Sequence, residues 1–136
     1  MNPEIVMKIK IAEAPEQVID FLVAKCEGEK YGPPTFRVHQ NSKGATVYLN
    51  AGMQQSGIPY RPSADWAQGG PITEREGIST VFQGDGHEWV ASLWDYETED
   101  WRLHTTGPTP LIAAMRCYIY AELGDEVEVP EELCTS

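Results

Sequence analysis

The side chains best suited to hold a small ligand gather in the stretch from Tyr60 to Gly77. It combines aromatic rings, arginines, an amide, a hydroxyl and three glycines. Glycine lets a backbone approach a ligand, an aromatic ring offers a stacking face, and arginine pairs with phosphate or carboxylate. The candidate binding residues here are Tyr60, Ser63, Asp65, Trp66, Gln68, Gly69, Gly70, Glu74 and Arg75. A structured loop in which Trp66 fills the core is the competing interpretation.

The turn before the last predicted helix is a second place where an anion could bind. The segment His104–Pro110 carries three threonine hydroxyls and leads into a helix N-terminus. Free N–H groups and the helix dipole favour negative charge there. Thr106 and Thr109 are therefore added to the candidate ligand-binding residues. Ordinary capping of the helix by Thr109 is the simpler alternative.

The chain shows no motif that singles out an enzyme, a metal site or a cofactor site. Its three histidines, His39, His87 and His104, are far apart, and none has a metal-ligand neighbour at a suitable spacing. Phosphate-loop, dinucleotide-binding and nucleophile-elbow patterns are missing from the sequence. We therefore expect no catalytic residue, metal or cofactor. A carboxylate pair such as Asp65 and Glu74 leaves a small hydrolase acting on a nucleotide as a weaker alternative.

Composition and charge limit the possible partners. The 136 residues include 21 acidic and 10 basic side chains, giving a formal net charge of −11. A protein that coats DNA or an anionic membrane needs a basic face, so both classes are excluded as direct partners. The acidity is concentrated at Asp95–Asp100 and Glu122–Glu132. Such acidity is usually a solvated surface, but it also permits an acidic inhibitor or DNA mimic that binds a host protein.

The cysteines and the hydropathy predict a reduced, cytoplasmic protein. Cys26, Cys117 and Cys134 are odd in number and widely spaced, unlike a secreted disulfide framework. Cys26 and Cys117 fall among apolar residues and are predicted to be buried. The N-terminus does not resemble a signal peptide, and no apolar run is long enough to cross a membrane.

Hydrophobic periodicity predicts the elements of the first half of the chain. Alternating apolar residues over Ile5–Ile11 predict a strand. Helical spacing follows from Pro15, with Gly28 as the expected stop. The runs Thr35–His39 and Ala45–Leu49 predict a hairpin around Asn41-Ser42-Lys43-Gly44. The stretch from 50 to 77 is rich in Gly, Pro, Ser and Gln, and we expect it to be irregular.

The second half predicts a hairpin, a strand and a long helix. Ile78–Gln83 and Glu88–Trp94 form the hairpin, and Trp101–Thr105 forms the strand. Leu111–Leu123 is apolar on most faces, so we expect a core helix, followed by an acidic tail at about 125–136. The fold class is α+β: a single domain over 1–136, with an antiparallel or mixed sheet of about five short strands. Two main helices are expected, with the C-terminal helix packed on the sheet.

Several segments resemble the NinX-like family of small proteins encoded by tailed phages and prophages. The most specific is SADWAQGGPITEREGI at residues 63–78. GPTPLIAAMRCY at 107–118 and GDEVEVP at 124–130 also match, as do the opening strand and helix with AKCEG at 24–28. The region 37–57 shows no match, so nothing carries over there. The family has no settled activity, so the resemblance implies a phage origin and the location of a site more than a function.

A phage origin favours one kind of ligand. Small phage proteins act mostly on the host, and one general way is to sequester nucleotide signals of bacterial immunity. A diphosphate-linked adenosine needs a stacking face, a phosphate-friendly helix end and acceptors for ribose hydroxyls. The residues that could supply these in turn are Trp66 or Tyr60, the Thr105–Thr109 turn with Arg75, and Asp65 or Glu74. The leading hypothesis is a non-catalytic, homo-oligomeric counter-defence protein in the host cytoplasm.

Overall fold

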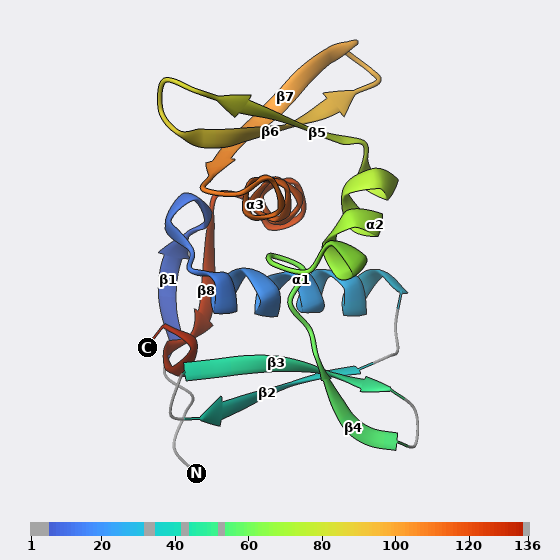
Figure 1. Ribbon diagram of the computed structural model, residues 1–136, viewed down its shortest axis with the longest axis vertical. Coiled ribbons are helices and arrows are strands. Elements are labelled where there is room, and N and C mark those ends of the chain that lie inside the picture. Colours follow the sequence, from blue (N-terminus) through green and yellow to red (C-terminus); the bar gives the residue numbers. More distant parts are fainter. Residues whose placement is uncertain (1–5, 32–34, 42–43, 52–53, 135–136) are drawn as a thin grey trace.

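Two helices lie between two three-stranded sheets in the computed structural model, which describes residues 6–31, 35–41, 44–51 and 54–134 (Figure 1). Helix α1 (Glu16–Tyr31) runs across the molecule, and helix α3 (Pro110–Leu123) is seen almost end-on above it. Helix α2 (Trp66–Glu76) closes one side, and a two-stranded sheet lies on the opposite side. The domain is α+β, as the sequence predicted.

The three sheets are antiparallel throughout, and both predicted hairpins are present. The described strands are β1 (Val6–Lys10) paired with β8 (Glu126–Pro130); β2 (Thr35–Asn41), β3 (Gly44–Ala51) and β4 (Gln54–Pro59); and β5 (Ile78–Gln83), β6 (Glu88–Asp95) and β7 (Asp100–Gly107). The central residues of the first predicted turn, Ser42 and Lys43, lie outside the described residues. The structure describes eight strands in these three sheets, whereas the sequence predicted about five.

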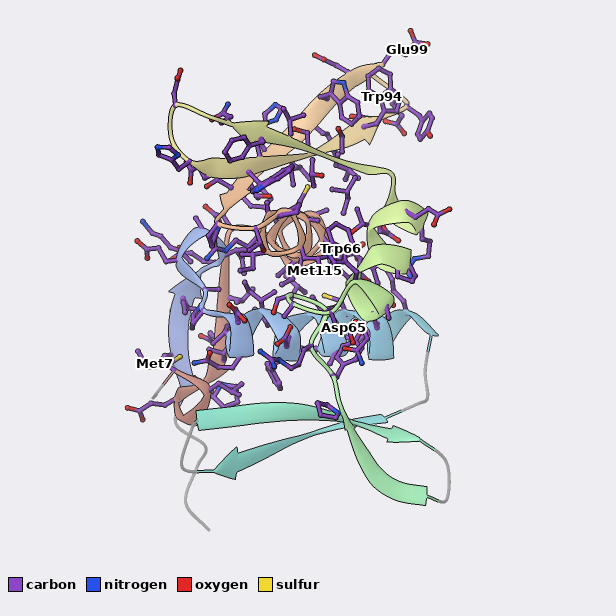
Figure 2. The ribbon with its side chains drawn as sticks, viewed as in Figure 1. Met7, Asp65, Trp66, Trp94, Glu99 and Met115 are labelled. Carbon is purple, nitrogen blue, oxygen red and sulfur yellow. The ribbon has the colours of Figure 1, made fainter. Side chains whose placement is uncertain are left out.

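Helix α3 forms the centre of the core because it is apolar on nearly every face. Thr109 caps its first turn by accepting the Ile112 N–H at 3.1 Å, and Gly124 follows its last residue. Met115 is fully buried and lies between α3 and α1 (Figure 2). The helix packs on the sheet β5–β6–β7, which confirms the predicted placement. Cys26 and Cys117 are buried with free thiols, also as predicted.

Helix α1 continues past the glycine that was expected to end it. Gly28 is helical, and the helix ends only at Tyr31. Side chains of its last turns are held by other helices: Glu27 binds Arg75, and Lys30 binds Glu122 at 2.6 Å. These contacts stabilise the last turns despite the low helix propensity of glycine.

The stretch from 50 to 77 is not irregular, because it contains β4 and α2. Asp65 caps α2 and Gly77 ends it in the left-handed conformation at φ 70°. Pro71 and two glycines lie within the helix, which is why propensity favoured a loop. Burial of Ile72 and the absence of a side chain at Gly69 favour the helix through packing instead.

The segment predicted to be an acidic tail forms a strand and a short 3-10 turn. Strand β8 pairs with β1, placing Lys8 opposite Glu128 and Lys10 opposite Glu126. Val129 and Leu133 are fully buried, the latter in the short 3-10 turn Glu131–Leu133. A similar turn, Ile11–Glu13, connects β1 to α1. The first and last described segments therefore support each other.

Candidate functional site

Three helices meet at a polar cluster that contains one of the predicted ligand residues. Arg75 of α2 faces Glu27 of α1 through two hydrogen bonds, Nη1 to Oε1 at 3.0 Å and Nη2 to Oε2 at 2.7 Å. Its Nε donates to Glu76 Oε2 at 2.8 Å. The Tyr118 hydroxyl of α3 donates to Glu27 Oε2 at 2.5 Å. The guanidinium that was predicted to clamp phosphate is thus occupied by carboxylates of its own chain.

The ionisation of this cluster follows from its contacts. Burial alone would raise the pKa of Glu27, but the hydrogen bonds from Arg75 and Tyr118 outweigh it, so the pKa is lowered. Burial and the bond to Glu27 raise the pKa of Tyr118. The hydrogen bond to Glu27 raises the pKa of Arg75. The cluster holds two carboxylates, a guanidinium and a neutral phenol, and the contacts among them tie the three helices together.

The segment before α2 is anchored to α1 by a buried carboxyl group that sequence patterns did not reveal. Asp20 Oδ1 accepts the backbone N–H of Ser63 at 2.9 Å. Burial raises the pKa of Asp20 to about 6, although the Ser63 contacts and the charge of Arg61 lower it. The Ser63 hydroxyl lies near the Asp20 carboxyl group and helps to lower its pKa. This buried hydroxyl has no hydrogen-bond partner among the described residues. Tyr60 is buried too, and burial raises its pKa.

Two further predicted ligand residues stabilise the start of α2. Asp65 is exposed, and its Oδ1 accepts the Ala67 N–H at 2.9 Å as the helix cap. Gln68 donates to the Pro59 carbonyl at 3.0 Å and accepts the Arg61 N–H at 2.6 Å. Its amide therefore closes the segment that precedes the helix. These contacts explain polar residues here without a ligand.

The paired glycines of α2 have different roles. A Cβ at Gly69 would collide with the Pro62 carbonyl oxygen and lie 2.8 Å from Leu111 Cδ2, so the position needs glycine for close packing. A Cβ at Gly70 would lie 3.6 Å from Trp66 Cε3, so this glycine lies beside the indole ring. Because Leu111 belongs to the first turn of α3, Gly69 brings the two candidate stretches together.

Trp66 is the predicted aromatic residue that remains open to solvent. It is the first residue of α2, beside the cap Asp65, and is 57% exposed (Figure 2). Arg61, in the same segment, has a side chain 56% exposed and a long ion pair to Glu16 at 3.8 Å. Arg61 is therefore the more exposed cation of this stretch, whereas the Arg75 side chain is 35% exposed and is paired with Glu27. Arg61 lies in the sequence Pro59-Tyr60-Arg61-Pro62, and nothing in that sequence indicated that it would be more exposed than Arg75.

The structure separates the carboxylates of the hydrolase alternative. Asp65 precedes the first residue of α2 and Glu74 is close to its last. At a rise of about 1.5 Å per residue, their backbones are about 13 Å apart along the axis. Both side chains are exposed. They do not form an acid–base pair on a shared substrate atom.

The threonine turn serves the packing of α3. Besides the Thr109 cap, the Thr106 carbonyl accepts Arg116 Nη1 at 2.8 Å. Arg116 Nη2 donates to the Ala14 carbonyl at 2.9 Å, which links β7, α3 and the segment just before α1. Burial lowers the pKa of Arg116. The cation in the middle of the apolar helix thus joins three backbone segments.

The described part of the chain contains neither a metal-binding group of side chains nor a helix that could span a membrane. No three His, Cys, Asp or Glu side chains are grouped so that they could hold a metal ion there. Within the same residues, no helix has the length and apolar character needed to cross a membrane.

The family model described as "Bacteriophage P22, NinX" matches residues 10–122. The chain therefore belongs to the NinX family of phage proteins, as the motifs at 63–78 and 107–118 suggested. Comparison with curated proteins found no match.

Proposed function

We propose that this phage protein binds and sequesters a small nucleotide-derived ligand in the host cytoplasm, without altering it chemically. The ligand class is an adenosine linked to a diphosphate, as in signalling molecules of bacterial immunity. The observation that carries the proposal is the exposure of Trp66 at the start of α2, in the most specific family segment. An exposed tryptophan face can stack on a base, and such stacking contributes about 1–3 kcal/mol.

The neighbours of Trp66 provide the remaining chemistry. Arg61 is exposed and only loosely paired, so its guanidinium can turn to a diphosphate. Asp65 uses one oxygen for the helix cap and has a second that can accept a ribose hydroxyl. Glycine at position 70 leaves the side of the indole unobstructed. In this proposal Arg75, Tyr60 and Ser63 hold the segment in place rather than contact the ligand.

Thermal melting and calorimetry with defined probes test the proposal. The probes are ADP-ribose, a cyclic dinucleotide, ADP and adenosine. At least one diphosphate-containing probe should raise the melting temperature, because a ligand that binds only the folded state stabilises it. Trp66→Ala should remove the shift, and Arg61→Ala should reduce it for the diphosphate probes but not for adenosine.

Trp101→Ala is the matched control, since it removes an exposed tryptophan that lies on strand β7 rather than on helix α2. It should leave the shift unchanged. A melting temperature that no probe alters, or a shift that survives Trp66→Ala, contradicts the proposal. Homo-oligomer formation, predicted together with the ligand, stays a prediction that sedimentation equilibrium can check.

A further inference from the structure

The sheet β5–β6–β7 has one face on the core and one face toward solvent. Helix α3 covers the first face, where Ala91 is fully buried and Thr105 Oγ1 donates to the Ala113 carbonyl at 2.8 Å. Side chains alternate between the faces of a strand, so the residues between these point away from α3. Figure 1 shows this sheet at one end of the molecule, with α3 beneath it.

The face away from α3 carries two pairs of apolar side chains, one on each side of Ser92 and His104, and these pairs are called here the outer stripe. Its members are Val81 of β5, Val90 and Trp94 of β6, and Trp101 of β7. Val81 lies opposite Val90, and the rings of Trp94 and Trp101 meet edge to face with centroids 5.1 Å apart. Val81 is 60% exposed and Trp101 is 43% exposed. Large apolar side chains that gather on one surface indicate an interaction site.

A bulge in β7 places the second tryptophan in this stripe. Leu103 and His104 together face Ser92, and Leu103 takes a positive φ of 58°. The bulge lets Trp101 point outward while Thr105 points toward α3. The Ser92 hydroxyl and His104 Nδ1, 2.6 Å apart, join the strands on the outer side. The geometry of the stripe is thus fixed by the backbone.

The border of the outer stripe is acidic. Glu88, Asp95, Glu97, Glu99 and Asp100 lie on β6, β7 and the turn that connects them. Figure 2 shows Trp94 and Glu99 together at the far end of this sheet. The nearby cation Arg102 is within 3.8 Å of Asp95, which offsets one charge.

This charge pattern selects among the possible occupants of the stripe. A second copy would bring two acidic borders together, and nucleic acid or an anionic membrane would be repelled for the same reason. A protein whose basic residues surround an apolar patch complements both features. Aromatic residues at the centre of a patch with charged groups at its rim are typical of protein interfaces.

We propose that the outer stripe is a docking surface for a partner protein with a basic border and an apolar centre. The surface is independent of the ligand site proposed at Trp66. Trp94 and Trp101 fill the centre of the contact, and the carboxylates steer the partner and set its orientation.

The test uses the full chain immobilised as bait in an extract of a bacterial host. The retained protein is identified by mass spectrometry, purified and titrated against four forms of the bait: wild type, Val81→Asp, Trp101→Ala and Trp66→Ala. The expected partner has a basic surface, and Val81→Asp and Trp101→Ala each weaken binding about tenfold or more. Trp66→Ala should leave the affinity within about twofold, and rising salt should weaken the wild-type complex.

The melting temperature of each variant is measured first, and Trp101→Ala serves if Val81→Asp does not fold. The proposal is overturned if no protein is retained, or if the retained protein binds the outer-stripe variants as tightly as wild type. It is also overturned if sedimentation shows a wild-type dimer that Val81→Asp dissociates, because a second copy would then occupy the stripe.

Discussion

Arg75 of α2 and Glu27 of α1 form a two-pronged ion pair that joins positions 48 residues apart in sequence, with the shorter contact at 2.7 Å. Tyr118 of α3 donates to the same carboxylate. Arg75 is the one cation of the family segment at residues 63–78, and it therefore connects helices. Because Arg75 is engaged with Glu27, we assign the proposed phosphate contact to Arg61, and Trp66 keeps its predicted stacking role.

Arg75→Ala should destabilise the fold. It leaves the largely buried carboxylate of Glu27 with one fewer cation and removes three charged hydrogen bonds, two to Glu27 and one to Glu76. We expect the free energy of unfolding to fall by about 2 kcal/mol after allowing for the partial exposure of Arg75. Urea unfolding measures the change. Arg61→Ala is the control, with an expected change below about 0.5 kcal/mol; equal effects of the two variants would contradict the assignment.

Asp20 should make stability depend on pH in a defined direction. Its pKa rises from the ordinary 3.8 to about 6 in the folded protein because of burial. Between these values the folded state keeps a proton that the unfolded chain releases, so its contribution to the free energy of unfolding falls as pH rises. About two pKa units correspond to about 3 kcal/mol.

Asp20→Asn isolates this effect because it keeps an oxygen for the Ser63 N–H without a titrating group. The gain in stability of the variant over wild type should be larger at pH 7 than at pH 4. Other carboxylates titrate in both proteins and cancel in the comparison, including Glu27, whose lowered pKa acts in the opposite direction. A difference that is independent of pH would show that Asp20 is not the group responsible.

Gly69→Ala should be costly although alanine favours helices. The new Cβ would collide with the Pro62 carbonyl oxygen and crowd Leu111. We expect a loss of about 2 kcal/mol in the free energy of unfolding. Gly28→Ala is the matched control in α1, where a Cβ meets nothing within 4 Å. It should stabilise the protein by about 0.5–1 kcal/mol; a loss there, or none at position 69, would contradict the packing described.

Thr109→Ala tests the cap of the central helix. Removing the oxygen that accepts the Ile112 N–H should lower the free energy of unfolding by about 1 kcal/mol. Thr109→Ser keeps the hydroxyl and should remain close to wild type. If both substitutions cost the same, packing of the methyl group rather than capping would explain the threonine.

The fold could be predicted where its signals are local. Thr109, Pro110 and Gly124 mark the ends of α3, and apolar residues between them fill it, so pattern and structure agree. Helix α2 was missed because Pro71 and the glycines lower helix propensity, while the packing that favours the helix involves Pro62 and Leu111. The signs that could have found it were Asp65 as a cap and Gly77 as a stop.

The site was predicted less well because several of its polar residues pair with partners that are far away in the sequence. Asp20 and Ser63 are 43 residues apart, and a single sequence carries no mark of such a partnership. Composition alone could identify the segment around Trp66 as rich in binding chemistry. It could not show that Gln68, Asp65 and Arg75 are engaged in holding that segment in place.

Mass spectrometry of ligand released by heat tests the proposed function most directly. The protein is incubated with ADP-ribose, a cyclic dinucleotide and ADP, separated from free probe, and denatured. We predict that at least one diphosphate-containing probe is retained by wild type and released intact, and that Trp66→Ala retains none of it. Release of a chemically altered probe, or equal retention by Trp66→Ala, would contradict sequestration at Trp66.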